Sequence, residues 1–293
     1  AVRPLACDSR FVFWPVNHEY FFDPVAWEQY FQSRSLAGIV VGTSDSAPGR
    51  KIECAARMAA GKIGLKIALV EDYAGNHSPV PGSKTDVLIV ESGSAAALCS
   101  RRLGATRPAV AVFPPARYDP YRRVLTTIRA STHTTWATSE LRPRVLWAGQ
   151  PESQDSIETL RRIAPTLREL NAKVLIKTHP RDPLHLKGTY AELLADHAID
   201  CSDLSSHTVQ SAMQAAPRLV ITQFSSVAIE AGFYGIPAVH VLYDDVGAQR
   251  LLSKKGYPVP LHCAEGAAFV VRKPGQELET IEKAVFDETA RAT

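Results

Sequence analysis

Several features that define large protein classes are scarce or missing in this sequence. The five cysteines are far apart and none belongs to a Cys-x-x-Cys pair, which argues against a disulfide framework and against a zinc motif. No apolar run approaches the ~20 residues that span a bilayer, and no signal peptide is recognisable. Lys and Arg form no dense run, so no nucleic-acid partner and at most a peripheral membrane association are expected. The expected compartment is a reducing cytoplasm.

The sequence also lacks a dinucleotide fingerprint. It contains no G-x-G-x-x-G pattern, which argues against a nicotinamide enzyme, and it has no internal repeat or low-complexity segment. It does have the length of about two domains, because 293 residues exceed the usual single domain. Its content of 45% hydrophobic and 22% charged residues is that of an ordinary globular protein.

Short apolar runs alternate with segments of helical periodicity along the first half of the chain. Strands are predicted at 11–16, 36–41, 66–70, 86–90 and 109–113, and helices at 50–63 and 94–103. The aromatic stripe of segment 17–35 is typical of a core-facing connector helix. This alternation predicts an α/β fold with parallel sheets and helices on both faces. A region rich in Thr, Ser and Pro near residue 143, with a helix at 118–129 before it, predicts two domains, 1–143 and 144–293.

The stretch from Pro217 to Val241 has the pattern of a strand, a turn, a helix and a second strand. An apolar run at Leu219–Thr222 is followed by the polar turn and then by helical spacing at Val227–Tyr234. Ser225 or Ser226 can cap this helix, and the backbone N–H groups of its first turn favour an anion such as phosphate. Helix capping alone is the alternative explanation for a serine at this position.

A second turn of the same kind follows the strand 174–176. It consists of Lys177, Thr178, His179 and Pro180, and Pro180 fixes the chain just beyond the imidazole. Ligands of open α/β sheets bind at the carboxyl ends of the strands, so we expect both turns to open on one crevice. The His179 ring can donate to a phosphate oxygen, which would raise its pKa. A surface histidine is the alternative.

A His-Pro pair after one strand and a Ser-Ser pair after a later one resemble the paired signatures of bacterial sialyltransferases. Related transferases that build capsules and cell-wall polymers are similar in this respect. The resemblance covers residues 144–241 and implies the glycosyltransferase B fold, two Rossmann-like domains facing each other across a cleft. It implies an acceptor-side first domain and a second domain that binds the nucleotide. The candidate donor contacts are Gly149, Gln150, Lys177, His179, Pro180, Gln223, Ser225, Ser226 and Glu230.

Two adjacent carboxylates, Glu71 and Asp72, end the strand 66–70. A carboxylate near a sugar hydroxyl can take its proton as the glycosidic bond forms. The pair is similar to an acidic-acidic-glycine signature that supplies the base in bacterial sialyltransferases, although two residues separate it here from Gly75. A solvated strand end, with Asp72 in a turn, is the alternative. Further acceptor-side candidates are Thr43, Ser44 and His77, with Asp45 beside them.

The sequence thus predicts an inverting, metal-independent glycosyltransferase. The expected donor is a cytidine monophosphate sugar acid of the sialic acid or Kdo type, the acceptor is a glycan or glycolipid, and no cofactor is needed. Alternatives are a CDP-polyol phosphotransferase, a UDP-sugar 2-epimerase and, from a different class, a two-lobed solute-binding protein. The acidic pair Asp244 and Asp245 supplies too few ligands to predict a metal site. Residues 276–291 are predicted to form a final amphipathic helix, which in two-domain transferases often packs back across the first domain.

Overall fold

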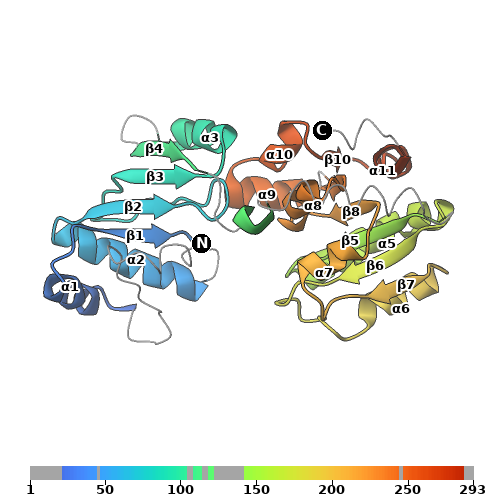
Figure 1. Cartoon of the computed structure of the whole chain (residues 1–293), viewed down its shortest axis with the longest axis horizontal. Coiled ribbons are helices and arrows are strands. Elements are labelled where there is room, and N and C mark those ends of the chain that lie inside the picture. Colours follow the sequence, from blue (N-terminus) through green and yellow to red (C-terminus); the bar gives the residue numbers. More distant parts are fainter. Residues whose placement is uncertain are drawn as a thin grey trace. The chain divides into compact units, whose positions relative to one another are not determined.

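The computed structural model describes residues 22–44, 47–103, 108–113, 118–121, 142–243 and 247–286. The chain divides into two compact units, Ala1–Asp119 (unit 1) and Pro120–Thr293 (unit 2). Each unit holds one parallel sheet, as Figure 1 shows, so the predicted two-domain α/β fold is confirmed. The predicted strand 11–16, Asp45, most of the helix 118–129 and the pair Asp244 and Asp245 lie outside the described residues. Among the described helices, none is long and apolar enough to cross a bilayer.

The sheet of unit 1 has the order β1-β2-β3-β4, with all pairs parallel. Helix α2 follows β1 and helix α3 follows β3, whereas residues 71–86 join β2 to β3 without a helix. The strand predicted at 66–70 has these bounds in the structure, and the helices predicted at 50–63 and 94–103 are also confirmed. The elements are β1 (Gly38–Gly42), α2 (Ala47–Lys62), β2 (Lys66–Val70), β3 (Val87–Val90), α3 (Gly93–Leu103) and β4 (Ala109–Val112).

The aromatic stripe before β1 is described from Phe22 onward; Phe22 is 41% exposed, whereas Trp27 and Phe31 belong to the core, as the pattern predicts. Most of its described part lies on helix α1 (Pro24–Ser33). The N-cap residue of this helix is Asp23, whose carboxylate accepts a hydrogen bond from the backbone N–H of Val25. Trp27 and Phe31 are buried against a face of α2 that is built from alanines. Burying each such ring stabilises the fold by about 1.5–3 kcal/mol, and the small alanine side chains let the two helices approach closely.

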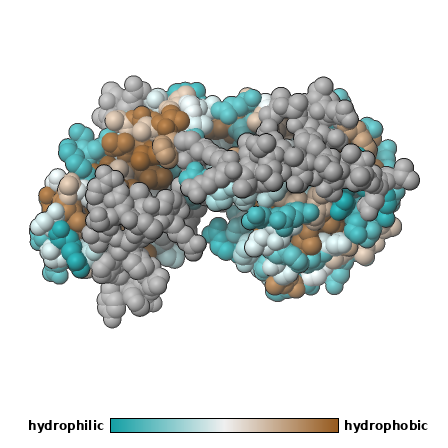
Figure 2. Space-filling model, in the orientation of Figure 1, coloured by the Kyte–Doolittle hydropathy of each residue, from teal (hydrophilic) through white to brown (hydrophobic). Residues whose placement is uncertain are grey.

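Apolar side chains are exposed near the edge strand β4. Val112 is 52% exposed, and Phe113, which follows the strand, is 66% exposed. Brown surface gathers over this part of unit 1 in Figure 2, where Figure 1 places β3, β4 and α3. The inner strands differ, since Leu69 of β2 and Leu88 of β3 are fully buried.

The sheet of unit 2 has the order β10-β9-β8-β5-β6-β7, again with all pairs parallel. Numbered from the first strand of the unit, this is the 3-2-1-4-5-6 order of a Rossmann fold, and the order reverses between β5 and β8. Every residue of β8 and β9 is buried, as expected for inner strands of a parallel sheet. The strands are β5 (Arg144–Ala148), β6 (Lys173–Lys177), β7 (Cys201–Asp203), β8 (Leu219–Thr222), β9 (Ala238–Val241) and β10 (Phe269–Val271).

Helices cover both faces of this sheet. Alternate strand residues enter two separate cores: Val145, Ile176 and Ile221 pack with α5 and α6, whereas Leu146 and Val220 pack with α7 and α8. The described part of the last helix, α11, packs against β9, β10 and α5 within the same unit. The helices are α5 (Ser153–Glu169), α6 (Thr189–Asp196), α7 (Val209–Gln214), α8 (Val227–Phe233), α9 (Gly247–Lys255), α10 (Leu261–Ala264) and α11 (Glu277–Phe286).

Candidate functional site

The loops after β5 and β8 meet at the point where the strand order of unit 2 reverses. The hydroxyl of Thr222, at the end of β8, donates to the carbonyl of Ala148 at 2.7 Å and accepts from the side-chain amide of Gln150 at 3.0 Å. All three residues are buried. In open α/β sheets this reversal is where a ligand binds, at the carboxyl ends of the strands. Gln150 was predicted to contact the sugar donor. In the structure its side-chain amide instead hydrogen-bonds Thr222 and so links the ends of β5 and β8.

The Ser225–Ser226 turn begins helix α8, and Ser225 is the residue that caps it. The Oγ of Ser225 accepts from the backbone N–H of Val227 at 3.3 Å, whereas Ser226 makes no side-chain cap. The backbone N–H of Ser225 lies 3.4 Å from the hydroxyl of Thr222, which ties the turn to the strand end. Both serines are half-buried, so the turn keeps a surface that a ligand can reach.

Gln223 points away from this surface. Its side-chain amide donates to Thr159 at 2.7 Å and to the carbonyl of Asp155 at 3.2 Å, both on α5. The side chain is 4% exposed. Gln223 therefore packs the loop after β8 onto α5, and its predicted contact with the sugar donor stays a prediction.

A tight turn orients His179 at the end of the loop after β6. The carbonyl of His179 accepts from the N–H of Asp182 at 2.9 Å, with Pro180 at the second position, where proline is favoured. The N–H of Arg181 donates to Nδ1 of His179 at 3.0 Å, so the proton of the neutral ring is on Nε2. Burial, and then the charge of Arg181, lower the pKa of His179. The half-buried ring is thus a neutral Nε2–H donor.

Buried hydrogen bonds brace this loop. The carboxylate of Asp182 accepts from Tyr190 at 2.5 Å and from the N–H of Leu184 at 2.8 Å. The N–H of Thr178 donates to Ser205 at 3.1 Å, and Lys177 donates to the carbonyl of Ser205 at 3.0 Å. Burial lowers the pKa of Lys177, whose side chain is 8% exposed and joins β6 to the end of β7. Lys177 was predicted to contact the sugar donor. In the structure its side chain instead holds the loop after β6 to the end of β7.

Glu230, predicted to reach ribose hydroxyls, accepts a hydrogen bond from Tyr121 at 2.5 Å. The ring of Tyr121 also stacks on Phe233 at 5.4 Å between centroids. Gly149, the remaining predicted contact, donates its N–H to the carbonyl of Lys177 at 2.9 Å and so joins the ends of β5 and β6. Among the predicted polar contacts, the ring of His179 and the two serines keep part of their surface exposed at this strand edge.

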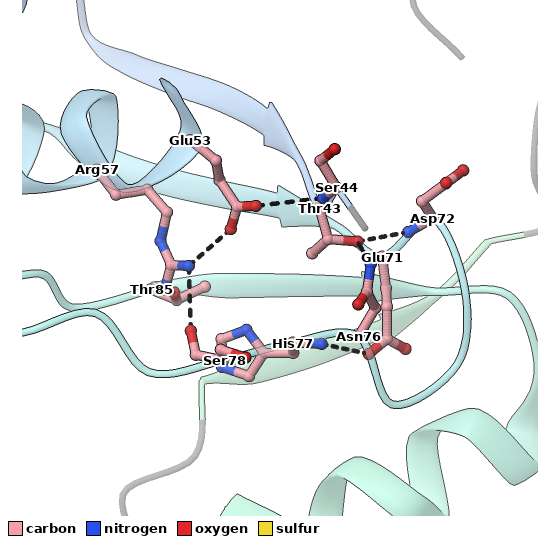
Figure 3. A network of polar contacts seen from close by, with 10 residues as sticks. All are labelled: Thr43, Ser44, Glu53, Arg57, Glu71, Asp72, Asn76, His77, Ser78 and Thr85. Carbon is pink, nitrogen blue, oxygen red and sulfur yellow. Dashed lines mark hydrogen bonds and ion pairs between the residues drawn. The ribbon is translucent and has the colours of Figure 1, made fainter. Parts of the chain in front are cut away.

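In unit 1, the two carboxylates after β2 have opposite surroundings. Glu71 is 4% exposed and accepts from the backbone N–H of His77 at 3.0 Å, whereas Asp72 is exposed. Burial raises the pKa of Glu71 to about 7. The N–H of Asp72 donates to the hydroxyl of Thr43 at 2.9 Å, which fixes the start of the loop (Figure 3). Adjacent residues at a strand end point to opposite sides, and here only Asp72 points outward.

An ion pair on α2 holds the loops around these carboxylates, as Figure 3 shows. Arg57 and Glu53 are 2.9 Å apart and both are buried. Arg57 also donates to Thr85 at 3.2 Å, and Glu53 accepts from the N–H of Ser44 at 3.3 Å. The sequence signal for this pair was weak, because charged residues four apart on a helix usually lie on a solvated face.

His77, the secondary candidate for the base, lies beside this pair. His77 is 9% exposed, and burial together with the charges of Arg57 and Arg102 lowers its pKa to about 4. The ring is therefore neutral near pH 7. Of the acceptor-side candidates, Thr43 anchors the loop of Asp72 through its hydroxyl, and Ser44 binds Glu53 through its backbone.

Comparison with solved structures shows which fold the two units form. MurG from Acinetobacter baumannii matches with a TM-score of 0.59 and 11% identity, over 96% of this chain and 76% of its own. UDP-N-acetylglucosamine 2-epimerase from Rickettsia bellii matches with a TM-score of 0.60 and 11% identity, over 95% and 73%. The Neisseria meningitidis UDP-GlcNAc 2-epimerase bound to UDP-GlcNAc matches with a TM-score of 0.57 and 12% identity, over 92% and 73%. No family model and no curated protein matched the chain.

These structures share the glycosyltransferase B fold, so the predicted fold class is confirmed. The likeness extends over nearly the whole chain, but the identities are low and establish the fold alone. The narrower resemblance to sialyltransferases is not among these matches and stays a prediction.

Proposed function

We propose that this protein is an enzyme that acts on a nucleotide-linked sugar, with unit 2 as the nucleotide-binding unit. The observation that carries the proposal is the edge where the strand order of unit 2 reverses. Gly149, Thr222 and the Ser225–Ser226 turn meet there, with His179 on the loop of the neighbouring strand β6. In doubly wound sheets this edge binds nucleotides, and helix starts there favour phosphate.

The neutral His179 ring fits the leaving phosphate of such a donor. An Nε2–H donor needs no positive charge to bind a phosphate oxygen, and a phosphate beside it would raise its pKa again. A hydrogen-bond donor held in place stabilises the negative charge that develops on the phosphate in the transition state. This stabilisation is the main way in which such a group raises the rate.

The proposed reaction is a single inverting displacement. The acceptor oxygen attacks the anomeric carbon, and the bond from that carbon to the phosphate oxygen breaks. The acceptor proton passes to a carboxylate, which we assign to Asp72 because it is the exposed member of the pair in unit 1. The new charge on the phosphate is stabilised by His179 and the serine turn. We retain a cytidine monophosphate sugar acid as the expected donor.

A second candidate function is a UDP-sugar 2-epimerase. It is favoured by the comparisons, because several structures of this fold that match the chain are UDP-GlcNAc 2-epimerases, some of them bound to UDP-GlcNAc or UDP. Incubating the chain with UDP-GlcNAc and no acceptor separates the two candidates. An epimerase changes the configuration at C2 of the sugar, whereas a transferase specific for a cytidine donor leaves it unchanged.

The test of nucleotide binding is a thermal-shift screen of the whole chain against cytidine, uridine and guanosine nucleotides. A nucleotide at ~100-fold over its dissociation constant adds about 2.7 kcal/mol to the free energy of unfolding. We expect His179→Ala to reduce this shift. We also expect it to lower turnover by about 10²- to 10³-fold, because one hydrogen-bond donor that stabilises the developing charge is lost. The matched control is His197→Ala, at the C-cap of α6. Stabilisation by a free sugar or amino acid and by no nucleotide would instead favour a solute-binding protein.

A further inference from the structure

Three side chains of the kinds that bind metals come together at β9. His240 lies on β9 and is fully buried, and His262 and Cys263 are consecutive residues of the short helix α10. The Nε2 atoms of the two histidines are 2.8 Å apart, and one ligand atom from each of the three residues lies within 4.8 Å of the others. The fold thus places the imidazole of His240 beside that of His262, which lies 22 residues later in the sequence, with the thiol of Cys263 close to both.

A backbone carbonyl fixes the tautomer of His240. Its Nδ1 lies 2.8 Å from the carbonyl oxygen of Gln223, and a carbonyl only accepts, so Nδ1 carries the proton. The lone pair of the neutral ring is then on Nε2, the atom that faces His262. Metal-bound histidines are commonly oriented in this way, with the second ring N–H donated to a carbonyl or carboxylate.

His262 can offer a second lone pair at the same point. The hydrogen bond between the two Nε2 atoms needs a proton on one of them and a lone pair on the other. In the hydrogen-bonded pair, His262 donates Nε2–H to His240. With its proton on Nδ1 instead, His262 presents the lone pair of Nε2, and the hydrogen bond between the rings gives way to two bonds to a cation.

The donor set indicates which cation fits. Imidazole nitrogens and a thiolate are the ligands of borderline and soft metals, whereas Mg²⁺ and Ca²⁺ take oxygen ligands. A tetrahedral zinc ion binds nitrogen at about 2.0–2.1 Å and sulfur at about 2.3 Å, which separates two nitrogens by about 3.3 Å. The two rings therefore need to part by about half an ångström, and the sulfur of Cys263 needs to approach. Both adjustments are within reach of the half-buried side chains on a four-residue helix.

We propose that His240, His262 and Cys263 bind one zinc ion, with a water molecule as the fourth ligand. Zinc–sulfur bond formation releases the Cys263 thiol proton to solvent, because the thiolate is the form that binds zinc. The ion takes no part in the displacement proposed above. It fastens α10 to β9 and, through His240 and the carbonyl of Gln223, supports the loop that carries Ser225.

The test uses the full chain without a polyhistidine tag. The protein is incubated with excess ZnCl₂ and dialysed against metal-free buffer, and the retained zinc is measured by mass spectrometry. We expect one equivalent per chain in the wild type and near-complete loss in His262→Ala and in Cys263→Ser. The fully buried His240 is left intact so that folding is preserved. Replacement by Co²⁺ gives the wild type a near-ultraviolet thiolate-to-cobalt absorption band that Cys263→Ser lacks.

Matched controls are Cys201→Ser on β7 and His197→Ala after α6, which remove a half-buried thiol and an imidazole elsewhere in unit 2. Both controls should retain one equivalent of zinc. Circular dichroism and unfolding temperature check that every variant is folded. The proposal is overturned if the wild type retains less than one equivalent, or if either folded site variant retains as much zinc as the wild type.

Discussion

Glu71 and Asp72 are neighbours in the sequence but meet different environments in the fold. Glu71 turns into the core of unit 1 beside His77, and Asp72 turns outward from the loop that Thr43 holds. A buried carboxyl with a raised pKa is poorly suited to bind an acceptor directly, because its surface is not accessible. The exposed neighbour is the better general base.

If Asp72 removes the acceptor proton, Asp72→Asn should retain nucleotide affinity and lose transfer by about 10²- to 10⁴-fold. The nucleotide is assigned to unit 2, so the two effects should separate. Nucleotide affinity by calorimetry and transfer rate are measured on the same samples. Glu71→Gln is the control and should transfer at close to the wild-type rate. Full transfer by Asp72→Asn would place the base elsewhere, with His77 and Asp45 as the next candidates.

Glu71 should also make stability depend on pH. Burial raises its pKa from 4.5 to about 7, so the folded state holds this proton more tightly than the unfolded state does. The resulting stability is fully present below pH 4.5 and is lost as the pH rises through 7. Relative to wild type, Glu71→Gln should therefore gain up to about 3 kcal/mol over this range.

The measurement is the free energy of unfolding in urea for wild type and Glu71→Gln at a series of pH values. Buried histidines with lowered pKa values, His77 among them, change stability in the opposite sense over part of this range. The contributions of His240 and His262, which lie in unit 2, are common to both proteins and cancel in the difference. A difference that does not vary with pH would show that Glu71 titrates normally in the folded state.

At the scale of elements, the ends of β5 and β8 are held together by one hydroxyl. Thr222 donates to Ala148 and accepts from Gln150, and the N–H of Ser225 lies beside it. The position of the Ser225–Ser226 turn therefore depends on Thr222, a fully buried residue that a ligand cannot contact directly.

Replacing Thr222 with Val keeps the shape of the side chain and removes the hydroxyl. We expect a loss of about 1–3 kcal/mol in the free energy of unfolding, because a buried amide of Gln150 is left without its acceptor. Nucleotide affinity should fall as well, because the Ser225 turn loses its anchor. Thr166→Val, on α5, is the matched control and should leave the affinity unchanged. If the Thr222→Val protein binds the nucleotide with wild-type affinity, the Ser225–Ser226 turn is not part of the nucleotide site.

Several elements could be predicted from the sequence because their signals are local. The strands 66–70 and 219–222 have the predicted bounds, since each is a short apolar run between polar turns. Helix α5 could not be predicted in this way, because Pro165 lies inside it and an interior proline argues against a helix. An interior proline costs a helix about 3 kcal/mol. The buried Leu160, Ile163 and Leu167 of α5 each contribute about 1.5–3 kcal/mol, which outweighs that cost.

At the scale of the whole molecule, the chain forms two units with separate cores. The buried residues of α1 and α2 form one cluster in unit 1, and the two faces of the second sheet form the clusters of unit 2. Unit 2 begins at Pro120, and Tyr121 packs on α8. Assignment of the nucleotide to unit 2 and of the acceptor to unit 1 is a prediction at this scale.

Amide hydrogen exchange with and without a bound nucleotide tests that assignment. We expect slower exchange in the loops after β5, β6 and β8, because a bound ligand protects the backbone it contacts and stabilises the unit around it. Exchange in strands β2 and β3 of unit 1 should be unchanged, and peptides from these strands serve as the internal control. Equal or greater protection in unit 1 would contradict a nucleotide site in unit 2.

The sequence by itself determined where the strands β2, β6 and β8 lie and which polar turns follow them, because apolar runs and turn residues are properties of neighbouring positions. It therefore predicted that the loops of His179 and Ser225 share one edge of a sheet. Only the tertiary structure decided which of Glu71 and Asp72 is buried, and only it brought His240 to His262. Those outcomes depend on burial and hydrogen bonds supplied by elements distant in the sequence, and no local pattern records them.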